Sequence, residues 1–340
     1  MRHHLNTLFI STQGSWVFKD GKNIVVKNGG EVIGRVPIHL IQSVVCIGQV
    51  SVSAPLLGYC SESGVTVAYL DRNGRFQARV EGPVAGNVLL RKAQYLKSED
   101  DNTCKTIVST IVAAKVYNQR ALLRRSKRDH GDANGAITQA DKLLGRLLDK
   151  LPQDHTVDQL RGYEGDAARI YFECFPNTLR GDEYFTFSGR SRRPPKDAVN
   201  ALLSFTYVLL TNDCRSALET VGLDPACGYL HKDRPGRPSL ALDVSEEFRA
   251  PLAERLCLSL VNRKQLNKRH FTIGDAGAVM LNDDGRKIVI EQWQKRKSDE
   301  VTHAFMDEKM PMGTVIHAQA ILMARHLRGD IDAYVPYLTK

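Results

Sequence analysis

The sequence lacks the cysteine patterns that build small metal-bound or disulfide-bonded domains. Its seven cysteines are scattered over 340 residues, are odd in number and include no C-x-x-C pair. A zinc ribbon requires paired thiolates, and a disulfide framework requires a dense, even set of cysteines. The sequence therefore fits neither, and reduced thiols in a cytosol are the expected state.

Long hydrophobic runs are also missing. A membrane-spanning helix needs about 20 consecutive apolar residues, and no stretch of this chain approaches that length. The apolar run near the N-terminus is interrupted at residues 13–15 and is too short for a signal peptide. We therefore expect a cytoplasmic protein that does not associate with a membrane.

Four motifs of common enzyme classes are absent as well. The chain has no P-loop, no G-x-G-x-x-G opening a βαβ unit, no G-x-S-x-G and no H-E-x-x-H. ATP hydrolysis, dinucleotide-dependent redox chemistry, serine hydrolysis and zinc proteolysis are therefore unsupported.

What the chain does contain is an excess of positive charge. Hydrophobic residues make up 42% and charged residues 25%, as in a well-packed globular protein, while the net charge is +9. Such an excess indicates a polyanionic partner, with nucleic acid first and a membrane surface second. The length allows one large domain or two moderate ones.

The order of the predicted elements indicates an α+β protein with two domains. Between residues 5 and 81, short β-branched or aromatic segments alternate with turns, of which 27–30 and 71–74 are typical hairpin turns. One short helix is predicted over 54–62. From about residue 87 the apolar period becomes helical. This change predicts two domains, a small β domain (1–85) and a larger, mainly α-helical domain (86–340). The helical domain is predicted to hold helices over 103–128, 137–151, 156–175, after Asp197, over 251–267 and near the C-terminus, with a hairpin at 271–293.

His231 is the sharpest candidate for chemistry. It stands twelve positions before Asp243 and fifteen before Glu246, with a basic turn at 232–238 between them. An imidazole together with hard carboxylates suits Mn²⁺ or Mg²⁺, and neighbouring cations suit a phosphate-bearing substrate. A lone histidine is more often an ordinary surface residue, however, and two acids three apart also fit a helix cap. Spacing alone favours the cap.

Glu164 lies between Gly162 and Gly165 in the helix predicted over 156–175. Each glycine costs roughly 1 kcal/mol relative to alanine inside a helix. Either tight helix packing or close approach of a ligand must therefore compensate. Packing is the more frequent reason, and a ligand site is the second interpretation.

Two basic segments, 120–128 and 190–196, are each typical of a solvated face. Arg120, Arg124 and Arg128 recur every four residues, so they share one face of their predicted helix. Together with the net charge they indicate a surface that follows a phosphate backbone. No helix-turn-helix, zinc-finger or RNP signature accompanies them, so recognition of DNA backbone and shape is predicted rather than base readout.

Four segments together point to one protein family. They are YEGDAAR (163–169), PPKDAVNALLSFTYVLL (194–210), LDPACGYLHKDRPGRPSLALDVSEEFR (223–249) and AQAILMARHLRGDIDAYVPYL (318–338). Over essentially its whole length the chain resembles the CRISPR-associated endonuclease and integrase of spacer acquisition, the universal adaptation protein called Cas-one. The ending and residues 271–293 are most similar to the type I-C branch of that family.

The resemblance implies a catalytic metal site made of Glu164, His231 and Glu246, which would hold Mn²⁺ or Mg²⁺. Many relatives have aspartate at the position of Glu246, and Asp243 is then a supporting or helix-capping acid. Cations near the reacting phosphate would be Arg169, Lys232, Arg234 and Arg237. The three arginines of segment 120–128 are predicted to bind DNA away from it.

The implied activity is phosphodiester cleavage and transesterification that inserts spacer DNA into a CRISPR array. Implied partners are double-stranded and branched DNA, a second copy bound through the N-terminal β domain, and a small second adaptation protein that bridges two dimers. From the residues themselves two alternatives stay open. One is a DNA-binding scaffold without catalysis, and the other is a metal phosphoesterase acting on small molecules.

Overall fold

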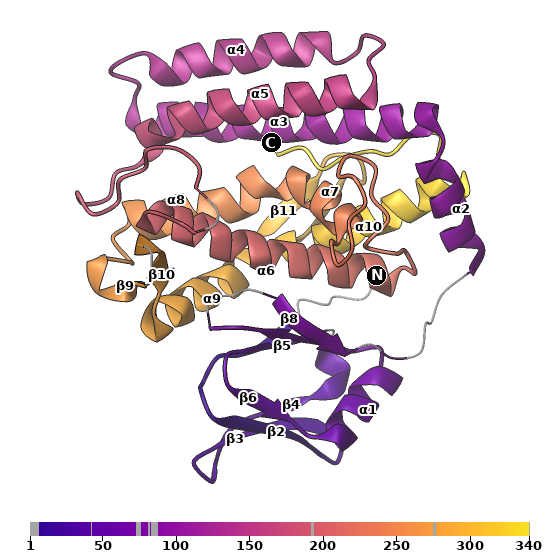
Figure 1. Cartoon of the computed structure of the whole chain (residues 1–340), viewed down its shortest axis with the longest axis vertical. Coiled ribbons are helices and arrows are strands. Elements are labelled where there is room, and N and C mark those ends of the chain that lie inside the picture. Colours follow the sequence, from indigo (N-terminus) through magenta and orange to yellow (C-terminus); the bar gives the residue numbers. More distant parts are fainter. Residues whose placement is uncertain are drawn as a thin grey trace.

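The computed structural model describes residues 7–41, 43–72, 76–80, 82, 88–191, 194–274 and 277–339. Within these ranges the chain is α+β, because an N-terminal part made mostly of strands precedes a larger, mainly helical part (Figure 1). The predicted fold class is confirmed. The boundary predicted after residue 85, and residues 73 and 74 of a predicted turn, lie outside the described ranges.

The N-terminal part forms two four-stranded sheets. One has the order β4-β3-β2-β6, and the other has the order β1-β5-β7-β8, in which β1, β5 and β7 are parallel and β8 is antiparallel to β7. All the strands except β6 were predicted, and helix α1 (Ala54–Glu62) has its predicted bounds. The strands are β1 (Thr7–Ile10), β2 (Ser15–Asp20), β3 (Asn23–Asn28), β4 (Glu31–Pro37), β5 (Ser43–Ile47), β6 (Val50–Val52), β7 (Thr66–Leu70) and β8 (Phe76–Val80).

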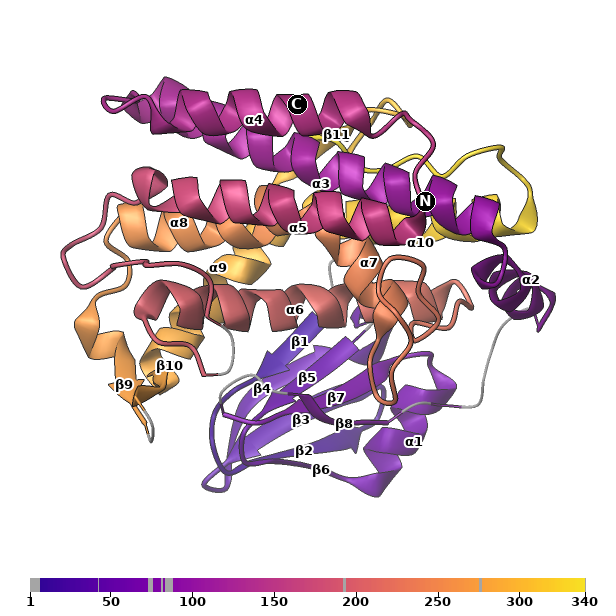
Figure 2. The same ribbon diagram turned by 45° about the horizontal axis from the view of Figure 1, so that its top comes forward.

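Strand β5 links the two parts of the fold. All its residues are buried, because successive side chains point to opposite faces of the sheet and both faces are covered. Val44 and Cys46 belong to the core shared with the other sheet, whereas Val45 and Ile47 belong to the core of the helical part. The sheet containing β5 therefore lies between the other sheet and the helices (Figure 2).

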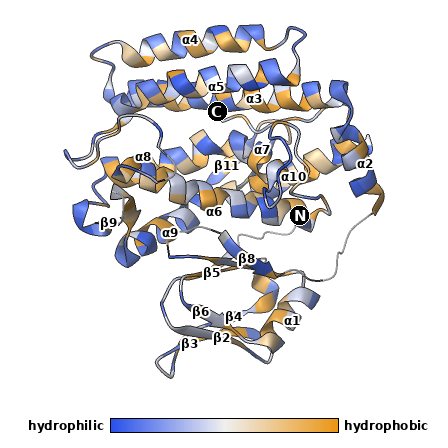
Figure 3. Cartoon of the chain, viewed as in Figure 1, coloured by the Kyte–Doolittle hydropathy of each residue, from blue (hydrophilic) through white to orange (hydrophobic). Residues whose placement is uncertain are grey.

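The helical part is organised around three helices that pack on one another, α3, α4 and α5 (Figures 1 and 2). Helix α7 packs against both α3 and α6. Polar and apolar residues are interspersed along α4 (Figure 3), and its buried residues Ile137, Ala140 and Leu144 recur every three or four positions, as expected for a surface helix with one apolar face. The helices are α2 (Val88–Ser98), α3 (Asp101–His130), α4 (Ala136–Lys150), α5 (Val157–Cys174), α6 (Ala198–Thr220), α7 (Ser239–Phe248), α8 (Arg255–Asn262), α9 (Asp283–Lys297) and α10 (Met312–Arg328).

The segment 271–293 differs from its prediction. Only β9 (Phe271–Ile273) and β10 (Val279–Leu281) form the predicted hairpin. The following residues form α9, because the Asn282 side chain accepts a hydrogen bond from the Gly285 backbone and so starts a helix. Buried residues then recur at helical spacing at Val289, Ile290 and Trp293. The hairpin prediction is wrong for this second half.

Between α7 and α8 the chain makes one π-helical turn, Arg249–Glu254. Pro251 has no N–H to donate to the carbonyl of Glu247, four residues earlier. The Asn118 side chain of α3 donates to that carbonyl instead, at 2.8 Å. Such turns are frequent at functional sites. The helix predicted over 251–267 therefore begins irregularly, and it ends at residue 262.

Helix α5 begins with a capping box, at the start predicted for this helix. The Thr156 side chain accepts a hydrogen bond from the Gln159 backbone, and the Gln159 side chain accepts one from the Thr156 backbone. We expect Thr156→Ala to lower the free energy of unfolding by about 1 kcal/mol, measured by urea denaturation. Thr156→Ser keeps the hydroxyl and is the matched control; equal loss in both variants would contradict the capping role.

Over the part of the chain that the structure covers, no helix has the length and apolar character needed to cross a membrane.

Candidate active site

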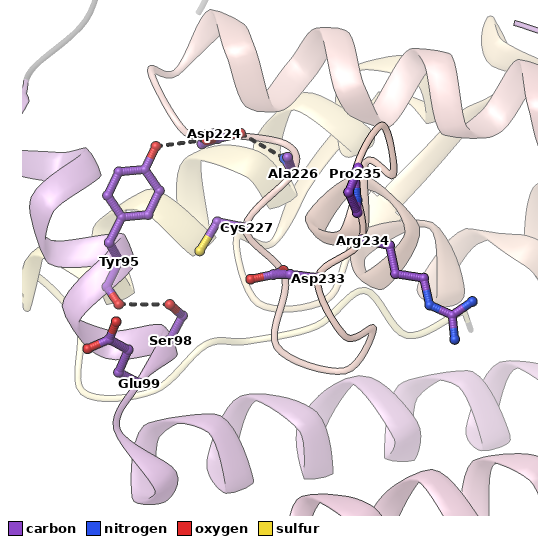
Figure 4. A pocket seen from close by; sticks show the side chains of 9 residues that line it. All are labelled: Tyr95, Ser98, Glu99, Asp224, Ala226, Cys227, Asp233, Arg234 and Pro235. Atoms are coloured by element: carbon purple, nitrogen blue, oxygen red, sulfur yellow. Dashed lines mark hydrogen bonds between the residues drawn. The ribbon is translucent and has the colours of Figure 1, made fainter.

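The loop that carries His231 is held in place by a helix distant in the sequence. Gln94 of α2 is buried, and its amide nitrogen donates to the carbonyls of Asp224 and Cys227 at 2.8 and 3.1 Å. Its amide oxygen accepts from the Asp224 backbone at 2.9 Å. The loop and α2 border a cleft of about 480 Å³, in which the Tyr95 hydroxyl donates to Asp224 (Figure 4).

Asp243 fixes the end of this loop from α7. Its carboxylate is fully buried and accepts hydrogen bonds from the backbone of Tyr229, Leu230 and His231 at 2.6, 3.0 and 3.0 Å. The same carboxylate lies 2.6 Å from Nδ1 of His231. Asp243 is in mid-helix and contacts the loop, so the helix-cap interpretation of Asp243 and Glu246 is wrong.

This contact also orients the imidazole. Because a carboxylate accepts hydrogen bonds, the neutral His231 ring carries its proton on Nδ1 and keeps the lone pair of Nε2 free. A carboxylate behind an imidazole is the usual arrangement at metal-binding histidines. Nε2 faces Glu246, with 3.9 Å to its Oε1.

Glu246 is buried among cations, one helical turn after Asp243. Its Oε1 lies 2.7 Å from Nη1 of Arg249, and its Oε2 lies 2.8 Å from Nζ of Lys115. Burial by itself raises the pKa of Glu246, but the charges of Arg249 and Lys115, and of His231 when it is protonated, outweigh it and hold the pKa at about 2. This carboxylate is therefore ionised at neutral pH.

Glu164 reaches the same place from α5. Its side chain is 27% exposed and pairs with Lys115. Gly162 and Gly165 beside it are exposed, and an added Cβ at either would meet no described atom within 4 Å. The two glycines therefore do not serve helix packing here. They leave bare backbone on both sides of Glu164, where a ligand can approach closely.

A second layer of buried groups supports Arg249. Its guanidinium lies 4.8 Å from the centre of the Tyr207 ring, a cation–π contact. The hydroxyls of Tyr207 and Tyr171 both donate to Glu254, at the end of the π-helical turn. Burial raises the pKa of Glu254.

The structure thus brings together Glu164, His231 and Glu246, with Asp243 behind His231. Two carboxylates and an imidazole are the donor set that suits Mn²⁺ or Mg²⁺, so the residues fit such an ion chemically. Among the described residues, however, no three His, Cys, Asp or Glu side chains converge as they stand on one ion. Lys115 lies between the two glutamates.

The predicted DNA-contacting residues are spread over several places. Lys232 and Arg234 are exposed on the loop after His231, and Arg237 is half-buried there. Arg169 is exposed on α5 near Asp166 and Glu173. Arg120 and Arg124 both bind Asp141 of α4, and exposed Arg128 contacts Asp129. Arg120 and Arg124 therefore join α3 to α4, and the DNA contacts of all three arginines remain a prediction.

Sequence reasoning missed three basic residues at this site: Lys115, Arg161 and Arg249. Arg161 of α5 donates to the carbonyl of Leu230 at 2.6 Å and braces the His231 loop. Lys115 could have been recognised from the sequence, because it lies three residues after Val112 and four after Ile111, on the apolar stripe that is buried in α3. A lysine at such a position needs an acidic partner.

Comparison with known proteins covers the whole chain. Residues 8–295 match the family described as CRISPR associated protein Cas1. A Rhodospirillum rubrum protein named CRISPR-associated endonuclease Cas1 2 is 52% identical over 347 aligned positions, which cover 100% of both chains. A Chlorobaculum tepidum protein named CRISPR-associated endonuclease Cas1 1 is 46% identical over 341 positions and 99% of both chains.

Solved structures share the fold. A Cas1 protein from Thermotoga maritima has a TM-score of 0.80 at 24% identity, over 97% of this chain and 98% of that one. A casposase bound to its integration product has a TM-score of 0.84 at 22% identity, over 97% and 92%. At such low sequence identity, these matches show only that the fold is shared. Because the family match spans most of the chain, and relatives at 52% and 46% identity cover nearly all of it, the chain belongs to the CRISPR-associated Cas1 family.

Proposed function

We propose that this chain is a metal-dependent DNA endonuclease and integrase that inserts spacer DNA into a CRISPR array. The observation that carries the proposal is the meeting of Glu164, His231 and Glu246, from α5, a loop and α7, beside an exposed basic turn. The relatives described above are named endonucleases. The integrase half of the proposal rests on the family assignment, and a casposase bound to its integration product has the same fold.

The divalent ion, Mn²⁺ or Mg²⁺, would be held by the two glutamates and Nε2 of His231. When bound, it would polarise the scissile phosphate and favour the attacking oxygen. In cleavage that oxygen belongs to water, and in integration it belongs to the 3′-hydroxyl of the incoming DNA.

The chain's own residues position the reactants. Asp243 holds the His231 ring in one orientation, and Arg161 and Gln94 keep its loop in place. Exposed Lys232 and Arg234 follow His231 directly, so they are suited to bind the phosphates on either side of the scissile bond. The bare backbone at Gly162 and Gly165 lets a DNA strand approach Glu164.

Partners and location belong to the same proposal. Pairing of two copies through the β sheets, and bridging by a small second adaptation protein, are what the family assignment leads us to expect. A chain in a solved Cas6-RT-Cas1–Cas2 complex shares this fold over 36% of its own length, with a TM-score of 0.83. A cytoplasmic location fits a DNA-processing role, and membership of the type I-C branch stays a prediction.

The proposal is tested by nicking of supercoiled plasmid and joining of 3′ ends, each with Mn²⁺, with Mg²⁺ and with EDTA. Both reactions are expected with metal and neither with EDTA. DNA binding that is weakened by salt but indifferent to metal, without strand cleavage or joining, would favour the scaffold alternative. Faster hydrolysis of mononucleotides than of duplex or branched DNA would favour the small-molecule phosphoesterase.

The variant Asp243→Asn tests whether Asp243 is needed to orient the His231 ring and hold its loop. An amide presents only one acceptor oxygen to four donors and offers its own N–H to some of them. We expect strand joining to slow by about 10- to 100-fold, while the protein stays folded by circular dichroism. Restoration of the wild-type rate by Asp243→Glu is not expected, because the longer side chain displaces the loop. An unchanged rate in Asp243→Asn would mean that ring orientation does not matter.

A further inference from the structure

Lys115 is a buried cation at the centre of the candidate active site. It lies on α3, and its side chain is 4% exposed. Its Nζ contacts Oε1 of Glu164 and lies 2.8 Å from Oε2 of Glu246. The two carboxylates come from different helices, α5 and α7, so this one ammonium group joins three helices at the point where they meet.

The apolar surroundings of Lys115 explain why its ammonium group needs the two carboxylates. Its neighbours on the buried stripe of α3 include Ile111, Val112 and Val116, which are fully or almost fully buried. An ammonium group in such a place is stable only with carboxylate partners. Within the part of the chain that the structure describes, its ion-pair partners are Glu164 and Glu246, the same two glutamates that the proposed function assigns to the metal.

One position between two carboxylates admits one cation at a time. The Lys115 ammonium already pairs with both glutamates, and a divalent ion bound by the same oxygens would face its positive charge at close range. We propose that Lys115 is a built-in counter-cation, which holds Glu164 to Glu246 in the metal-free protein and competes with the divalent ion for both. The inference rests on the proposed function, since it takes the glutamates as metal ligands.

Arg249 does not share this role. It is fixed by its contact with the Tyr207 ring and binds Oε1 of Glu246, the oxygen away from Lys115. Lysine, in contrast, carries a single ammonium on four flexible methylene groups. Nζ of Lys115 can therefore leave the carboxylates without any movement of α3, while Arg249 continues to compensate Glu246.

The test is Mn²⁺ binding to the full chain without DNA, measured by isothermal titration calorimetry at constant pH. Lys115→Met is expected to bind Mn²⁺ at least about tenfold more tightly than wild type, because the competing charge is gone. Lys115→Arg keeps the charge and is expected to lack this gain. Lys105→Met, on the same helix with Asp154 as partner at 3.7 Å, is the matched control and should bind as wild type does.

The outcomes separate the two proposals. Equal or weaker Mn²⁺ binding by folded Lys115→Met would overturn the competition. Absence of Mn²⁺ binding in wild type and in every variant would instead contradict the metal-dependent function. Wild-type crystals grown with and without Mn²⁺ give a check that needs no variant. Nζ of Lys115 is expected to leave hydrogen-bonding distance of at least one glutamate when the ion binds, and retention of both contacts would overturn the proposal.

Discussion

Replacing His231 with alanine is expected to slow both plasmid nicking and 3′-end joining by about a thousandfold or more. The imidazole supplies the only nitrogen donor of the proposed metal site, and its Nε2 faces Glu246 while Asp243 holds the opposite side of the ring. Initial rates with saturating Mn²⁺ and supercoiled plasmid measure the effect.

Stability distinguishes this loss from misfolding. The His231 side chain is 20% exposed, and Asp243 keeps its three backbone hydrogen bonds when the ring is removed. His231→Ala is therefore expected to unfold close to the wild-type urea midpoint. His39→Ala, at an exposed position in the N-terminal part, is the control and should keep full activity. Full activity in His231→Ala would show that the site lies elsewhere.

The local pattern of the sequence was enough to predict most elements but not the roles of Asp243 and Glu246. Two acids three apart fit a helix cap as well as a metal site, and the choice depends on where the helix starts. Helix α7 begins at Ser239, so both acids lie within the helix at buried positions, past its first turn. That position follows from contacts of α7 with α3, α6 and the His231 loop, which no spacing in the sequence reveals.

The same limit explains the error at residues 283–293. Ile288, Val289 and Ile290 are β-branched and favour a strand when read alone. The structure makes them helical, because Asn282 caps α9 and Trp293 is buried one turn further on, where its ring nitrogen donates to Asp213 of α6. Tertiary packing outweighed local preference here.

The three metal-ligand candidates were first named from residue patterns, and the family resemblance then selected them over the structural alternatives, whereas the basic residues that compensate them were not found. Glu164 and Glu246 are far apart in sequence, and only folding shows that one lysine lies between them. Comparison of motifs identifies residues that perform chemistry. It does not identify the buried partners that hold those residues in place.

Glu246→Gln is expected to cost about 3–5 kcal/mol of unfolding free energy in the absence of metal, and to abolish strand joining. The change keeps the shape of the side chain but removes the negative charge that compensates Arg249 and Lys115, both of which are largely buried. Urea denaturation in EDTA measures the loss. Glu246→Asp keeps the charge on a shorter side chain and is expected to lose less than half as much. Equal losses in both variants would show that packing, not charge, matters here.

The double variant with Lys115→Met and Glu246→Gln tests whether the charges of Lys115 and Glu246 stabilise the fold by compensating each other. Each single change leaves a charge without its partner, whereas the double change removes an anion and a cation together. The double variant is therefore expected to be more stable than the sum of the two single losses predicts, by at least about 1 kcal/mol. Lys105→Met combined with Glu246→Gln should be additive, because Lys105 pairs with Asp154 outside the site. Additivity in both double variants would mean that Lys115 and Glu246 do not compensate each other, and that the carboxylates are held together by the fold around them.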